Sequence, residues 1–373
     1  MATFKWIGNG TTNNWTEAAN WSLVSGTGSD ADGIPDTDDV ASFDGTSTKN
    51  ATINANFSIQ NLQVAAAYTG SISLGSNTLA VSGGFAIANA SSFDSGTGTV
   101  RFTGNQTVDS TAALYNLEVA AATGSLTLVK DLVVNNDLTI TDVSQIVGNG
   151  GTFNIKVSGD VITNDANFSN TNSAIQLVGS TDQSISGTGV LVNLDVAKTG
   201  GDVLLTDDLR LRGGTLSGSG QLKNAGGNAG GKVIFGEPSN FLNDSYTSNF
   251  TGSIDDVELK FHSGSNFILS KDLVVNNDLT ISEIGGITGN GGTFNIKVSG
   301  DVITNDANFS NTNSAIQLVG STDQSISGTG VLVNLDVAKT GGDVLLTDDL
   351  RLRGGTLSGS GHLKNFHCFQ WAV

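Results

Sequence analysis

Proline and cysteine are almost missing from this chain, which has 2 Pro and 1 Cys among 373 residues. Because a single cysteine, Cys368, cannot form an internal disulfide, the fold has to be stabilised by packing and hydrogen bonding. Aromatic residues make up 6% of the chain, and no segment repeats its apolar residues with the 3.6-residue period of a helix. We therefore expect almost no helix and no membrane-spanning helix.

Basic residues are also scarce. The chain has 17 Lys plus Arg against 35 Asp plus Glu, which gives a formal net charge of −18 at pH 7. Such a charge repels nucleic acids and anionic membranes, and it keeps a long β surface soluble. We expect no nucleic-acid partner and no membrane insertion.

Turn formers and β-branched residues dominate instead, with 49 Gly and many Ser, Thr, Asn and Val. Short apolar alternations such as Leu194/Val196 recur between clusters of Asn, Asp and Gly. Three short strands in each turn of roughly 20 residues are typical of a β-helix, whose coils stack with continuous strand pairing. An antiparallel sandwich or a series of small β domains would use similar strands.

A long duplication favours the repeat architecture. Residues Lys130 to Asn224 recur as Lys271 to Asn365 with seven substitutions, and a copied segment can lengthen a solenoid where a single globular core would have no place for it. A finer N-L-x-V repeat begins at Asn61, Asn116, Asn193 and Asn334. We predict one continuous β-solenoid over residues 51–365 that contains the copies 130–224 and 271–365, between a cap (1–50) and an atypical aromatic tail (366–373).

The first fifty residues hold three of the four tryptophans. Their pattern of W-x-G, W-x-x-x-x-N-W and P-x-x-x-D-x-V-x-F resembles a segment found ahead of β-solenoid regions in large bacterial surface and autotransporter-like adhesins. The matching residues are Trp6, Gly8, Trp15, Asn20, Trp21, Pro35, Asp39, Val40 and Phe43. The resemblance implies a right-handed parallel β-helix, and we interpret the aromatic cluster as a cap on its open sheet edge. Stacking of the tryptophan faces on a glycan is an alternative.

One acidic loop has the spacing of a calcium site. Gly28 to Asp36 resembles a D-x-D-x-D-G-x-x-D loop, in which Gly33 allows the sharp turn. The sequence departs from that pattern because Gly28 stands where a carboxylate is expected. A solvated acidic turn is the alternative to a Ca²⁺ site, whose ligands would be Asp30, Asp32, Asp36 and Asp39.

No other cluster carries a chemistry of its own. The sequence shows no nucleophile elbow and no catalytic triad. Arg210 and Arg212 lie beside Asp207 and Asp208 and recur in the second copy, which we interpret as a solvated ladder of charges rather than an active site. We therefore expect a protein that is not an enzyme.

Three functions fit these observations. The first is an extracellular or cell-surface structural protein, adhesin-like or filament-forming, with a glycan or cell-surface receptor as a further partner. The second is a phage tail fibre or other virion component, since the start MATFKWIG lacks the apolar region of a secretory signal. The third is a polysaccharide-active enzyme, by fold analogy. We expect end-to-end self-association in which the tail residues Phe366, Phe369 and Trp371 meet the cap residues Trp6, Trp15 and Trp21.

Overall fold

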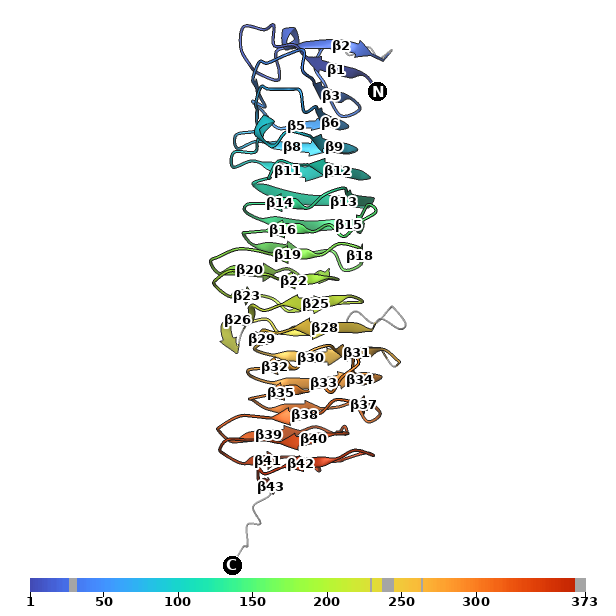
Figure 1. Cartoon of the computed structure of the whole chain (residues 1–373), viewed down its shortest axis with the longest axis vertical. Helices are drawn as coiled ribbons and strands as arrows, with labels where there is room; N and C mark the ends of the chain where they lie inside the picture. Colours follow the sequence, from blue (N-terminus) through green and yellow to red (C-terminus); the bar gives the residue numbers. More distant parts are fainter. Residues whose placement is uncertain (27–31, 229, 237–244, 263, 366–373) are drawn as a thin grey trace, which may run out of the picture. The chain divides into compact units, whose positions relative to one another are not determined.

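A computed structural model of the chain describes residues 1–26, 32–228, 230–236, 245–262 and 264–365. Its contacts divide the chain into two compact units, residues 1–179 and 180–373, each of which is described by itself. Both units consist of short, stacked strands (Figure 1). The first copy of the duplicated segment begins in the first unit and ends in the second, so the two copies are not separate closed domains.

The first unit contains strands and two short 3₁₀ helices. The helices are η1 (Ala18–Asn20) and η2 (Ala90–Ser92). The strands are β1 (Thr3–Trp6), β2 (Trp21–Ser25), β3 (Val40–Phe43), β4 (Ala51–Thr52), β5 (Phe57–Ile59), β6 (Asn61–Val64), β7 (Ile72–Ser73), β8 (Thr78–Val81), β9 (Gly84–Ile87), β10 (Phe93–Asp94), β11 (Thr99–Phe102), β12 (Gln106–Ser110), β13 (Asn116–Leu128), β14 (Leu132–Val134), β15 (Leu138–Gly148), β16 (Ile155–Val157), β17 (Val161–Thr163), β18 (Ser169–Thr171) and β19 (Ile175–Leu177).

Parallel pairing between successive coils holds this unit together. One column runs β1, β3, β6, β9, β12 and β13, and others run β5, β8, β11 and β13, and β14, β16 and β19. Strand β2 is the exception, because it pairs antiparallel with β1 at the edge of the sheet. The unit is thus a parallel β-solenoid with an antiparallel strand added at its N-terminal edge.

The second unit contains strands throughout its described part. They are β20 (Gln183–Ser186), β21 (Val190–Leu191), β22 (Leu194–Val196), β23 (Val203–Leu205), β24 (Leu209–Leu211), β25 (Thr215–Gly218), β26 (Gln221–Asn228), β27 (Val233–Phe235), β28 (Tyr246–Phe250), β29 (Ser253–Ile254), β30 (Val257–Lys260), β31 (Asn266–Leu269), β32 (Leu273–Val275), β33 (Leu279–Glu283), β34 (Gly286–Gly289), β35 (Ile296–Val298), β36 (Val302–Thr304), β37 (Ser310–Thr312), β38 (Ile316–Leu318), β39 (Gln324–Ser327), β40 (Leu335–Val337), β41 (Val344–Leu346), β42 (Leu357–Gly359) and β43 (Leu363–Asn365).

These strands form three parallel columns. The columns run from β20 through β23, β26 and β29 to β42, from β21 through β24, β27 and β30 to β43, and from β22 through β25, β28 and β31 to β37. Paired residues in successive coils lie about 20 positions apart, as Ile296, Ile316 and Leu335 do. The second unit is therefore also a parallel β-solenoid, and the predicted fold class is confirmed.

The core of each unit is a stack of inward-facing aliphatic side chains. Leu194 and Val196 are both fully buried, as their alternation predicts, while Asp195 between them is partly exposed. Asparagine and aspartate side chains join the coils where strands begin. The Asp131 carboxylate, for example, accepts a hydrogen bond from the backbone N–H of Asn154 at 2.9 Å. Among the described residues, no helix is long and apolar enough to span a membrane.

Candidate functional site

The predicted aromatic cap forms at the start of the first unit. The rings of Trp6 and Trp15 lie 5.1 and 4.6 Å from that of Trp21, and Phe43 packs against all three. Trp6 and Trp15 are fully buried, and Trp21 is only 6% exposed. These rings cover the first coils, so they offer almost no face for stacking on a glycan or a partner. Association at this end stays a prediction, and the exposed large hydrophobic side chains described there are those of Met1 and of Leu23 and Val24 on β2.

Hydrogen bonds from polar side chains hold the loop between Trp6 and Trp15 in place. The Glu17 carboxylate accepts hydrogen bonds from the backbone N–H and hydroxyl groups of Thr11 and Thr12. These bonds, the Thr12 hydroxyl first, lower the pKa of Glu17 to about 2. The buried Asn20 side chain accepts from the N–H of Gly10 and donates to the carbonyls of Thr12 and Asn14. Glu17 and Asn20 in the tryptophan motif thus hold the loop of the cap.

The predicted calcium ligands are only partly brought together. Asp30 lies outside the described residues, and Asp32 accepts a hydrogen bond from the N–H of Ile34 at 3.2 Å. Carboxylate oxygens of Asp36, Asp38 and Asp39 lie within 4.8 Å of one another. Asp38 was not among the predicted ligands, and Asp32 is not part of this group.

The contacts of Asp39 are those of a structural residue. Its carboxylate is buried and accepts hydrogen bonds from the N–H groups of Ala2, at 2.7 Å, and Asp36, at 3.3 Å. Burial raises the pKa of the neighbouring Asp36, and a hydrogen bond with Asp38 and the charges of Asp39 and Asp38 add to this effect. Calcium binding by this loop stays a prediction.

The remaining residues singled out in the sequence are those of the aromatic tail and of the charge ladder. Phe366, Phe369 and Trp371 lie outside the described residues, as does Cys368. Arg212 is buried, with 6% of its surface exposed, so the expectation of a solvated charge ladder was wrong for this side chain. Its duplicate Arg353 is exposed and donates to the carbonyl of Ala307 at 3.4 Å.

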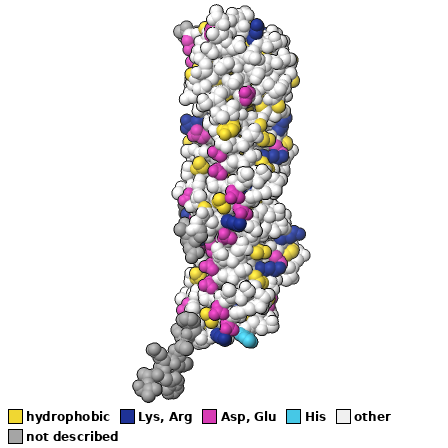
Figure 2. Space-filling view, turned by 90° about the vertical axis from the view of Figure 1, so that its left-hand side faces the viewer, with side chains coloured by type: hydrophobic (Ala, Val, Ile, Leu, Met, Phe, Trp, Pro, Cys, Tyr) yellow, Lys and Arg dark blue, Asp and Glu magenta, His cyan; other side chains and the backbone are white. Residues whose placement is uncertain are grey.

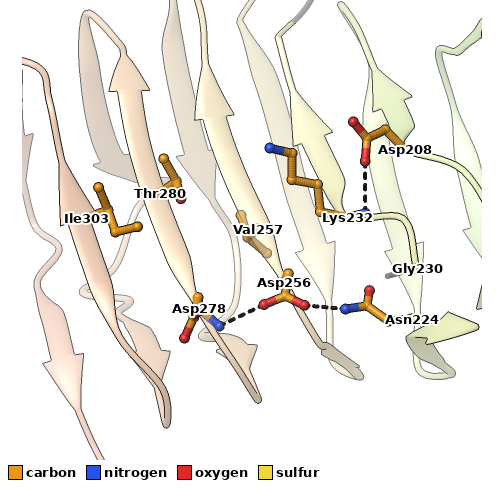
Figure 3. Close-up of a pocket in the computed structure, with 9 residues that line it drawn as sticks. All are labelled: Asp208, Asn224, Gly230, Lys232, Asp256, Val257, Asp278, Thr280 and Ile303. Atoms are coloured by element: carbon orange, nitrogen blue, oxygen red, sulfur yellow. Dashed lines mark hydrogen bonds between the residues drawn. The ribbon is translucent and has the colours of Figure 1, made fainter. Parts of the chain in front are cut away.

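The largest hollow that we describe lies on the second unit. It is an open groove of about 490 Å³ between β26 and the outer surface of β27, β30, β33 and β36 (Figure 3). Its lining combines acidic, amide and aliphatic groups from successive coils. The lining residues are Asp208, Asn224, Gly230, Lys232, Asp256, Val257, Asp278, Thr280 and Ile303.

Hydrogen bonds between coils fix the carboxylates of this groove. Asp256 accepts from the side-chain amide of Asn224 and from the N–H of Asp278, the latter at 3.0 Å (Figure 3). Asp208 accepts from the N–H of Lys232 at 3.2 Å. The ammonium group of Lys232 is paired with Glu258 at 2.6 Å, so it does not neutralise the three aspartates directly.

Sequence reasoning missed this groove. It forms where the chain between the two copies inserts the glycine-rich segment 225–231, which allows β26 to continue past its pairing with β23. Gly231 then crosses so close to the preceding turn that a Cβ atom would lie 1.8 Å from the carbonyl oxygen of Asp207. The glycine run was the available signal, but it does not say which acidic residues it brings together.

Acidic side chains are not confined to this groove. They recur along the face drawn in Figure 2, with basic side chains beside several of them. Two such pairs occupy equivalent positions in the two copies, Lys156 with Asp131 and Lys297 with Asp272, each at 2.7 Å. These two aspartates therefore connect neighbouring coils.

Comparison of the chain with protein-family models, with curated proteins and with solved structures gives no match. The fold places each unit in the class of parallel β-solenoids. Function has to be argued from the surfaces and contacts of those solenoids.

Proposed function

We propose that this protein is a non-enzymatic, extracellular structural protein, adhesin-like, whose copies associate by stacking coil on coil. The proposal rests on one surface of a coil that is present in both copies of the duplicated segment. The next coil covers this surface in the first copy, whereas it is exposed in the second copy. In the first copy, Leu211 and Leu216 are fully buried because Phe235 and Ser248 of the next coil pair with them. In the second copy, the same face contains Leu352 and Leu357, which are 40% and 51% exposed.

This pair of faces supports association because the first copy shows how a following coil covers such a face. Strands β27, β28 and β29 cover the face of the first copy through parallel pairing, from Leu209 to Leu222. An exposed row of strand N–H and C=O groups with apolar side chains is a template for the same kind of pairing. A second copy of the protein is the partner we propose for the face at Leu352 and Leu357.

Introduction of a charge at this face tests the proposal. Light scattering and negative-stain microscopy of the wild-type protein should show concentration-dependent end-to-end assemblies. Leu357→Asp should abolish them, because a carboxylate in the stacked face would be desolvated without a partner. Val133→Asp is the matched control, since Val133 is 36% exposed within the first unit. The proposal would be contradicted if the wild-type protein stayed monomeric at all concentrations, or if Leu357→Asp formed the same assemblies as the wild type.

The groove of the second unit favours a second candidate function, the binding or cleavage of a glycan. Its open shape, its polar lining and the aspartates Asp208, Asp256 and Asp278 suit hydroxyl-rich ligands and could supply acid and base groups. Incubation with a panel of oligosaccharides, followed by product analysis, tests cleavage. Turnover that is lost in Asp278→Asn would replace the structural proposal with an enzymatic one.

Calcium belongs to the proposal as a stabiliser of the cap. The carboxylates of Asp36, Asp38 and Asp39 are oxygen ligands of the kind that Ca²⁺ takes. Millimolar calcium should raise the melting temperature of the wild-type protein and leave that of Asp36→Asn plus Asp38→Asn unchanged. An equal rise in melting temperature in both proteins would show that these aspartates do not bind calcium.

A further inference from the structure

A ladder of three aspartates crosses successive coils of the second unit. The carboxylate of Asp256, just before β30, accepts the N–H of Asp278 at 3.0 Å. Asp278, just before β33, accepts the N–H of Asp301 at 2.7 Å, and Asp301, just before β36, accepts that of Ser325 at 2.6 Å. Each rung joins two coils by a charge-assisted hydrogen bond, but it also places like charges one coil apart.

The first copy repeats Asp278 and Asp301 as Asp137 and Asp160, but the rung before them, which lies outside the duplicated segment, is different. Asp137 is the duplicate of Asp278, and it accepts the N–H of Asp160 at 2.9 Å. The rung before it is Asn116, which accepts the N–H of Asp137 at 3.3 Å and the side-chain amide of Asn136 at 2.8 Å. The first corner therefore carries a neutral group where the second corner carries Asp256.

No cation is paired with the middle rung among the contacts described. The carboxylate of Asp256 lies on one side of Asp278 and that of Asp301 on the other, and Asp208 and Lys232 line the same groove. The nearby lysines have acidic partners of their own, Lys223 with Asp202 and Lys232 with Glu258, both at 2.6 Å. Repulsion along the ladder is thus opposed mainly by its hydrogen bonds.

We propose that the corner formed by Asp256, Asp278 and Asp301 is a pH-sensitive joint, which opens more readily at neutral pH and closes as the pH is lowered, whereas the duplicate corner at Asp137 lacks this response. A proton on Asp278 removes the repulsion between adjacent coils and adds a donor to the ladder. The joint lines the groove, so its closure also stiffens one wall of that groove. This inference does not depend on the proposed assembly function.

The direction of titration agrees with the geometry. Partial burial raises the pKa of Asp278, and the carboxylates of Asp301 and Asp256 add to the shift, against the opposite effect of the hydrogen bond from the N–H of Asp301. A carboxyl group whose folded pKa is raised binds more protons in the closed corner than in the opened one. Stability of the corner is then gained as the pH falls through the folded pKa and is fully present below the ordinary value of 3.8.

Hydrogen–deuterium exchange of the full chain tests the joint. Peptides covering 141–163 and 282–304 include the N–H donors Asp160 and Asp301, and they differ in mass because they contain the substituted positions. After correction for intrinsic rates, protection of 282–304 should rise as the pH falls from about 7 toward the ordinary carboxyl value of 3.8. Protection of 141–163 should stay level. A similar response in both peptides would overturn the proposal.

Reciprocal substitutions exchange the two corners. Asp256→Asn gives the second corner the rung of the first, and Asn224 can turn its amide so that its buried, unpartnered oxygen accepts from the new side chain. Asn116→Asp does the opposite in the first corner. The pH response should disappear from 282–304 in Asp256→Asn and appear in 141–163 in Asn116→Asp. A response that stays in place in both variants would refute the ladder as its cause.

Discussion

The two copies of the duplicated segment have almost the same sequence but different neighbours. Six of their seven substitutions fall at positions 141–145 and 147, on or beside strands β15, β33 and β34. In the first copy β15 pairs with β13, and in the second copy β33 and β34 pair with β30 and β31. Strands β13, β30 and β31 lie outside the duplicated segment, so the copies diverge where they contact dissimilar coils.

The contacts at these positions explain the divergence. Gln145 of the first copy donates to the hydroxyl of Ser125 on β13 at 2.9 Å, and β15 continues as one long strand. The equivalent residue of the second copy is Gly286, where a Cβ atom would lie 2.9 Å from side-chain oxygens of Asn266 and Ser310. Each coil of a solenoid is thus adapted to the coil before it, because that coil supplies half of its packing surface.

Burial separates the copies most strongly, and truncation of equivalent leucines measures the effect. Leu216→Ala should lower the free energy of unfolding by about 2 to 5 kcal/mol, because it leaves a cavity beneath the next coil. Leu357→Ala should cost less than about 1 kcal/mol, since the Leu357 side chain is 51% exposed. Chemical denaturation of both variants at a concentration below that of any assembly gives the comparison.

Leu211→Ala and Leu352→Ala provide a second pair, because Leu211 is fully buried and Leu352 is 40% exposed. Equal losses within each pair would show that the face of the second copy is covered in solution. Assembly at that face would make the losses equal only at high protein concentration. Repeating the denaturation over a series of protein concentrations therefore distinguishes packing within one molecule from stacking between molecules.

The sequence predicted what depends on a single coil. Alternation placed Leu194 and Val196 in the core, and the tryptophan pattern identified the cap, because both are set by local period and by the need to cover a sheet edge. It did not predict the groove, the nearness of Asp38 to Asp36, or the burial of Arg212. Those features arise from contacts across coils, whose register changes with each insertion.

Exchanging a substituted residue between the two copies tests whether each coil is adapted to the coil before it. Gly286→Gln gives the second copy the residue of the first, and it should destabilise the second unit by about 1 to 3 kcal/mol, because the side chain has no space beside Asn266 and Ser310. The reverse change, Gln145→Gly, should cost about 0.5 to 1 kcal/mol through backbone entropy and the lost contact with Ser125. Thermal unfolding checks both, and a stabilised Gly286→Gln would contradict the steric explanation.

The smallest effect concerns a feature that the copies share. Burial would raise the pKa values of Asp131 and Asp272, but hydrogen bonds from Lys156 and Lys297 and from the N–H groups of Asn154 and Asn295 outweigh it, so both pKa values are lowered. A carboxyl group with a lowered folded pKa stabilises the protein above its ordinary value of 3.8, and this stability is lost as the pH falls further.

Each of these ion pairs is more than a third exposed, so solvent screening limits its contribution to less than about 1 kcal/mol. Asp131→Asn and Asp272→Asn should therefore reduce stability slightly, and by the same amount, at pH values near neutrality, and neither should change it once the carboxyl groups of the wild type are protonated. Urea unfolding at about pH 6 and about pH 2.5 measures both differences. Unequal losses of stability would mean that the neighbouring coils change the strength of even these two equivalent ion pairs. Equivalent surface residues of the two copies would then also be expected to differ in their contributions to stability.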